Sequence, residues 1–93
     1  MKTVAILATL DTKADEAGFM RSEIESLGGQ ALLIDLSLVG ESHLSADVTK
    51  QDVISAGGGN LADLLVKPNR EESNPFIVAG TTKIVKELQL HQL

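Results

Sequence analysis

The sequence predicts an α/β fold: a Rossmann-like parallel sheet with flanking helices, truncated to two strands and three to four helices. The first observation is a continuous apolar run over residues 3–9, TVAILAT, which is typical of a strand covered on both faces. The second is a switch to helical period over residues 14–27, and the third is another apolar run over residues 30–36, QALLIDL. A strand, a helix and a strand at this spacing indicate a parallel crossover.

The first predicted helix has polar signals at both ends. Thr12 is a good N-cap, with Asp15 three residues later in a capping-box arrangement. Gly28 and Gly29 supply the stop. The helical period predicts a buried stripe made of Ala17, Met20, Ile24 and Leu27.

The middle of the chain predicts two short helices. Thr49 opens the first of them, which should run to about Ala56 and end at the glycines of residues 57–59. Asn60 can cap the second, over residues 61–66. We interpret the glycines as a helix stop and linker, since they do not follow a strand.

The last predicted helix begins at a cap on either Ser73 or Asn74, with Pro75 at its first position. Its buried stripe is expected to contain Ile77, Thr81, Ile84 and Leu88.

We expect residues 1–93 to form a single partial nucleotide-binding-like domain. The number of predicted strands is the reason for calling it partial. A sheet of two strands is marginal by itself, yet both runs have the apolar character of central strands. Three explanations remain open: the chain dimerises, it is the amino-terminal part of a larger α/β domain, or its helices cover an unusually small sheet.

Composition excludes several kinds of function. The 93 residues carry a net charge of -5, which disfavours nucleic acid and anionic membrane surfaces as partners. With no cysteine and two histidines outside any metal-ligand spacing, thiolate metal sites are excluded and no metal is expected. No Ser/His/Asp set or paired carboxylates can be assembled either, so an enzyme is the least supported class. We expect a cytoplasmic protein, because no stretch is long enough to span a bilayer.

The corner between the first strand and its helix is the best candidate site. In open α/β sheets, ligands bind at the carboxyl ends of strands, beside helix amino ends. The corner offers backbone N–H groups, two hydroxyls, a carboxylate and an ammonium. Its residues are Thr9, Leu10, Asp11, Thr12 and Lys13. It has neither the Walker pattern nor GxGxxG, and Thr12 as a simple helix cap remains an alternative.

Asp35, at the end of the second strand, is the other candidate. Dinucleotide folds place a ribose-binding acid at such a position. An aspartate there equally well caps the turn that follows its strand.

Two long segments resemble the amino end of the ATP-binding family that includes the tomato mosaic virus resistance protein. They are VAILATLDTKADEAGFMRSEIESLGGQALLIDLSLVGES and DVTKQDVISAGGGNLADL. The resemblance implies ATP, with magnesium, at the corner. It also implies a longer protein, since members of that family continue into a third strand with a glycine-rich loop and then a second domain.

Two functions are therefore expected as alternatives. The first is a nucleotide-binding module that holds ATP phosphates at the corner and is incomplete by itself. The second is a non-catalytic interaction or dimerisation module, or a truncated remnant without its own ligand. The expected partners are a nucleotide and either another copy of the chain or a separately encoded carboxyl-terminal portion.

Overall fold

The computed structural model describes residues 2–91 and confirms the α/β fold with a two-stranded parallel sheet and four helices. The elements are β1 Thr3–Ala8, α1 Leu10–Ser26, β2 Gln30–Asp35, α2 Lys50–Ala56, α3 Leu61–Val66 and α4 Arg70–His91. They form two compact units, Met1–Thr49 and Lys50–Leu93.

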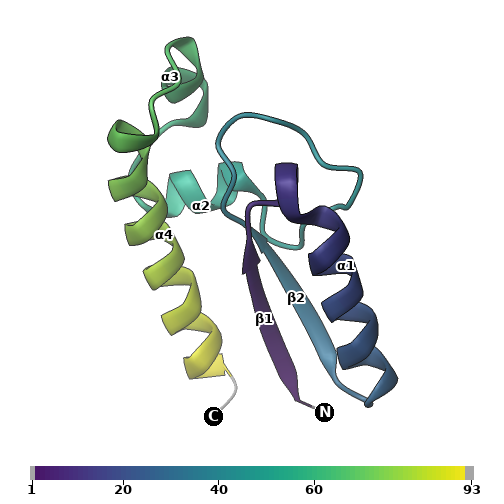
Figure 1. Ribbon diagram of the computed structural model, residues 1–93. Coiled ribbons are helices and arrows are strands. Elements are labelled where there is room, and N and C mark those ends of the chain that lie inside the picture. The colour runs from purple at the N-terminus through teal and green to yellow at the C-terminus, as the bar shows by residue number, and fades with distance from the viewer. Residues whose placement is uncertain (1, 92–93) are drawn as a thin grey trace. The chain divides into compact units, whose positions relative to one another are not determined.

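The first unit is a strand, a helix and a strand. β1 and β2 pair in parallel register from Thr3 opposite Gln30 to Ala8 opposite Asp35. α1 connects them and lies along the sheet (Figure 1). Gly28, with φ +86, lets the chain turn sharply out of the helix into β2.

The core of this unit lies between α1 and one face of the sheet. Ile6, Leu10, Ala17 and Leu33 are buried together there. The predicted stripe of α1 was correct at Ala17 but wrong at Met20 and Leu27, whose exposed fractions are 50% and 86%. The helix begins earlier than expected, and its buried face starts from Leu10 and Ala14.

A short segment at residues 47–48 covers the far edge of β2. The N–H of Leu33 donates to the Asp47 carboxylate at 2.8 Å, and the Leu33 carbonyl accepts from the Asp47 and Val48 N–H groups at 3.0 and 2.9 Å. The N–H of Asp35 donates to the Val48 carbonyl at 3.0 Å. Ile34 and Val48 form a single parallel bridge. β2 thus has partners on both of its edges.

The second unit consists of α2, α3 and α4. α3 begins as predicted, with the Asn60 side chain accepting from the Asp63 N–H at 3.2 Å. α2 and α4 approach so closely that a methyl group on Gly57 would overlap the Phe76 carbonyl, and one on Gly80 would overlap the Val53 carbonyl. Gly57 is therefore a packing residue as well as part of a helix stop.

The start of α4 differs from the prediction. The helix begins at Arg70, and Pro75 lies inside it. Asn69 provides the cap, because its side-chain oxygen accepts from the Glu71 N–H at 2.9 Å. Ser73, an expected cap, is fully buried, and its hydroxyl donates to the Asn69 carbonyl at 3.0 Å.

Candidate functional site

The predicted corner lies where β1 ends and α1 begins. α1 starts at Leu10, so Thr9 occupies the N-cap position and Thr12 lies in the first turn. The expectation that Thr12 is the N-cap was therefore wrong. At Lys13 the backbone leaves helical geometry, with φ −118 and ψ 22. The corner is a single turn joined to the main helix through a kink at this lysine.

Most backbone donors of the corner already have partners. The N–H groups of Thr12 and Lys13 both donate to the Thr9 carbonyl, at 3.1 and 2.9 Å. The N–H of Leu10 donates to the Asp35 carboxylate at 3.2 Å. The side chains of Thr9 and Thr12 lie with their hydroxyl oxygens 3.2 Å apart. What the corner offers a ligand is mainly side-chain hydroxyls and charges.

Asp35 is brought to the corner, where it joins the end of β2 to the start of α1. One of its oxygens accepts three hydrogen bonds, from the Leu10 N–H at 3.2 Å, the Ser37 N–H at 2.9 Å and the Ser37 hydroxyl at 2.6 Å. Both partner residues are buried. This arrangement holds the turn after β2 and pins it to α1.

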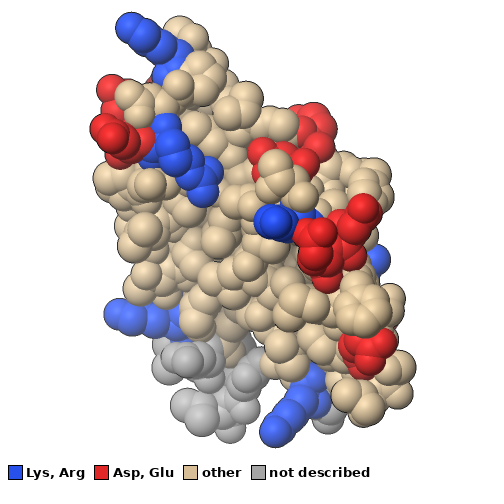
Figure 2. Space-filling view, in the orientation of Figure 1, with Lys and Arg blue, Asp and Glu red and all other residues tan. Residues whose placement is uncertain are grey.

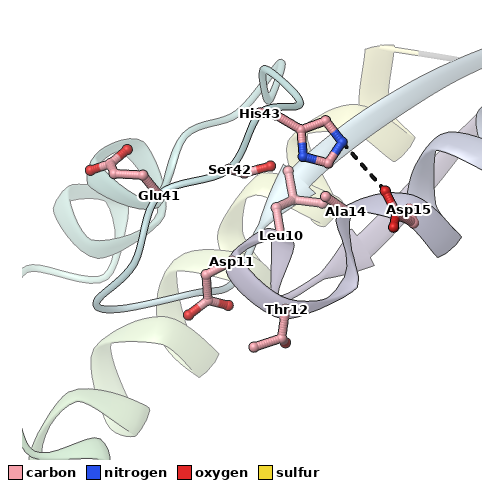
Figure 3. Close-up of a pocket in the computed structure, with 8 residues that line it drawn as sticks. All are labelled: Leu10, Asp11, Thr12, Ala14, Asp15, Glu41, Ser42 and His43. Carbon is pink, nitrogen blue, oxygen red and sulfur yellow. Dashed lines mark ion pairs between the residues drawn. The ribbon is translucent and has the colours of Figure 1, made fainter.

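A cavity of about 160 Å³ lies beside the first turns of α1. It is lined by Leu10, Asp11, Thr12, Ala14, Asp15, Glu41, Ser42 and His43. Figure 3 shows His43 facing Asp15, with Nε2 of the imidazole 3.4 Å from the carboxylate. Lys13, Thr9 and Asp35 are not among the lining residues, so this cavity and the predicted site coincide only at residues 10–12.

The cavity is acidic. Asp11, Asp15 and Glu41 contribute to its lining, and His43 is the basic side chain among the lining residues. Acidic side chains also gather on the surface over α1 and the loop that follows β2 (Figure 2). Such a lining repels a bare phosphate and suits donors or cations. Within residues 2–91, no set of three or more His, Cys, Asp or Glu side chains is arranged to hold a metal ion.

The loop after β2 contributes Glu41, Ser42 and His43, which the sequence did not single out for the site. Gly40, with φ +60, lies against the Asp11 side chain, where a methyl group on it would come within 2.7 Å of the Asp11 Cβ. This close approach brings Glu41, Ser42 and His43 alongside α1. The sequence signal for this approach was Gly40, a glycine in a polar loop that directly follows a strand.

A parallel strand pair with a helical crossover and a polar corner at the strand ends defines an α/β domain of the parallel-sheet class. The family model that matches residues 2–93 is described as the "Uncharacterised protein family (UPF0261) N-terminal domain". The chain belongs to the UPF0261 family.

Its relatives carry the same family name. A UPF0261 protein of Clostridium tetani is 37% identical over 87 residues, which are 94% of this chain and 22% of that protein. UPF0261 proteins of Brucella suis and Brucella melitensis are each 29% identical over 85 residues, 91% of this chain and 20% of theirs. The chain therefore spans about a fifth of the length of these curated relatives. No solved structure matches it.

These matches correct one expectation. The assignment to the family of the tomato mosaic virus resistance protein was wrong, because the family model and the relatives are those of UPF0261. Among residues 2–91, no helix has both the length and the apolar character that crossing a bilayer requires.

Proposed function

We propose that the chain is a non-catalytic interaction module of UPF0261 proteins, whose sheet is completed by a further strand along β1. The observation that carries this proposal is the open edge of β1. The sheet in the described residues has the order β1-β2, so β1 has a strand partner on one side only.

The backbone groups at this edge follow from the parallel pairing. Lys2 and Ala8 direct their carbonyls toward β2, accepting from Gln30 and Leu36 at 2.8 and 2.9 Å. In a strand, successive residues direct their backbone groups to opposite sides. The N–H and carbonyl groups of Thr3, Ala5 and Leu7 therefore point to the open edge, where another strand can pair with them.

Apolar side chains border the same edge. Val4 and Leu7 of β1 are 41% and 43% exposed. A groove of about 300 Å³ adjoins Val4 and is also lined by Ile24 and Leu27 of the segment that ends α1. An open strand edge with exposed apolar neighbours invites pairing with another chain segment. The partner would be another copy of the chain or a separate carboxyl-terminal portion of a longer family protein.

Amide hydrogen exchange tests the proposal. The amides of Thr3, Ala5 and Leu7 should exchange quickly in dilute solution and become protected when the partner strand is present. We would measure them by NMR in this chain at about 10 μM and about 1 mM, and measure the aligned amides in the full-length Clostridium tetani relative. Rapid exchange at these three positions in every sample would refute the proposal, with the amides of Val4 and Ile6 as internal controls because they face β2.

A second candidate is binding of ATP with magnesium at the corner of residues 9–13. It is favoured by the two hydroxyls of Thr9 and Thr12, which lie 3.2 Å apart where β1 passes into the first turn of α1. Lys13 would contact a phosphate, and Asp11 would hold a water of the magnesium ion. Calorimetric titration with ATP and magnesium tests this function. No heat of binding, with the chain alone or with a full-length relative, would eliminate it, and Lys13→Ala should weaken any binding seen.

A further inference from the structure

We infer that the strand which completes the sheet is β1 of a second copy, paired antiparallel about a two-fold axis that passes between the two Ala5 residues. This inference rests on the proposed interaction function and names its partner. The argument comes from the pattern of free backbone groups, from charge and from the exposed side chains.

The open edge is complementary to itself in a single register. When Ala5 lies opposite Ala5 of the second copy, Thr3 of each copy lies opposite Leu7 of the other. In an antiparallel sheet, alternate pairs exchange two hydrogen bonds each. Thr3, Ala5 and Leu7 are the residues whose groups point outward, so three pairs give roughly six bonds and every outward group is used. Shifting the register by two residues would leave one of these pairs without its partner. Shifting it by one residue would place outward-pointing backbone groups opposite residues whose groups point toward β2.

Charge favours the antiparallel direction. Lys2 lies exposed at the amino end of β1, while Asp11 and Asp35 lie near the carboxyl end of the same sheet. Antiparallel pairing places Lys2 of each copy at the acidic end of the other. Parallel pairing of two copies would place the two Lys2 ammonium groups beside each other.

The exposed apolar side chains of β1 also gain partners. In this register Val4 lies opposite Ile6 of the second copy, in a pair without hydrogen bonds, where side chains approach most closely. Leu7 lies opposite Thr3. The segment Thr3–Ala8 contains no proline and no charge, the features by which edge strands usually avoid such pairing.

The interface is short, so the association should depend on concentration. Six residues per strand bury less than the roughly 1,200 Å² typical of stable complexes. The product is a four-stranded sheet with the order β2-β1-β1-β2, above the strand number needed for an independently stable sheet.

Cysteine cross-linking tests the register directly, because the chain has no cysteine of its own. In the inferred pair, the Cα atoms of the two Ala5 residues lie about 5.5 Å apart, within the range that a disulfide spans. Ala5→Cys should therefore form a covalent dimer on mild oxidation at about 1 mM. Thr3→Cys alone should not, since its two copies would lie about 14 Å apart, but Thr3→Cys mixed with Leu7→Cys should form a heterodimer.

The controls separate this inference from the proposed function. Phe19→Cys, an exposed site on α1, reports random collisions, and far-ultraviolet circular dichroism checks that each variant is folded. Cross-linking of Ala5→Cys no faster than Phe19→Cys, or of Thr3→Cys with itself, would overturn the inferred pairing. If the edge amides are then protected in the full-length relative, the strand comes from the rest of that protein and the interaction function stands. If those amides are unprotected there as well, the proposed function itself fails.

Discussion

Replacing Asp35 tests whether this carboxylate holds the candidate site together. Asp35→Ala removes three hydrogen bonds to one oxygen and leaves the Leu10 and Ser37 N–H groups without acceptors. Leu10 and Ser37 are only 1% and 2% exposed. A buried donor left unpaired costs about 1–3 kcal/mol. Two such donors give about 2–6 kcal/mol, and we expect about 3 kcal/mol because Asp35 is half-buried and water can partly replace it.

Urea denaturation followed by circular dichroism at 222 nm measures this loss as a change in the free energy of unfolding. Asp35→Asn keeps an acceptor oxygen and should lose about half as much. Asp15→Ala is the matched control, since the partner of Asp15 within residues 2–91 is the exposed His43, and its loss should change stability by less than about 0.5 kcal/mol. If Asp35→Ala proves as stable as the Asp15→Ala control, the carboxylate does not hold the corner, and its strand-end position would have to serve a ligand instead.

Three further substitutions test particular contacts, each by the free energy of unfolding in urea. Gly80→Ala should cost about 3 kcal/mol, because the added methyl meets a rigid carbonyl of α2; a neutral result would mean that α2 and α4 are further apart than described. Gly40→Ala should cost about 1–2 kcal/mol from its φ of +60 and shift the NMR signal of the Asp11 amide, whereas an unmoved signal would contradict the contact between them. Asn69→Ala should cost about 1 kcal/mol and Asn74→Ala much less. A larger loss for Asn74→Ala than for Asn69→Ala would indicate that the helix starts at Asn74.

The sequence predicted the elements whose limits are set locally. Both strands were found from continuous apolar runs, and α3 from an Asn60 cap that acts only on its own helix. The start of α4 was predicted wrongly because proline is most common in the first turn of a helix, so Pro75 indicated a later start. The Asn69 side chain that caps the helix lies earlier in the sequence. The pairing of Asp47 with Leu33 was also missed, since a side chain that replaces a backbone partner leaves no periodic pattern.

The candidate site was predicted only in part, for a similar reason. The position of the corner follows from the order of strand and helix, and Asp35 does reach it. The partners of the corner donors depend on tertiary contacts, so the sequence could not indicate that Thr9 and Asp35 already occupy them. Nor could it indicate that a loop, turning at Gly40, brings further acidic and polar groups to α1. ATP binding at this corner stays a prediction.

The hydrogen bonds of Asp47 and Val48 have a consequence for how far the protein can assemble. Because they occupy the outer side of β2 at Leu33 and Asp35, β1 is the side from which the described sheet can grow along its full length. When two copies pair through β1, neither copy keeps an unpaired β1 edge to which a third copy could bind. Fibres require two free sides on every unit, whereas a single one gives a closed pair. A short segment without regular secondary structure can therefore limit an aggregation-prone apolar strand to a finite assembly.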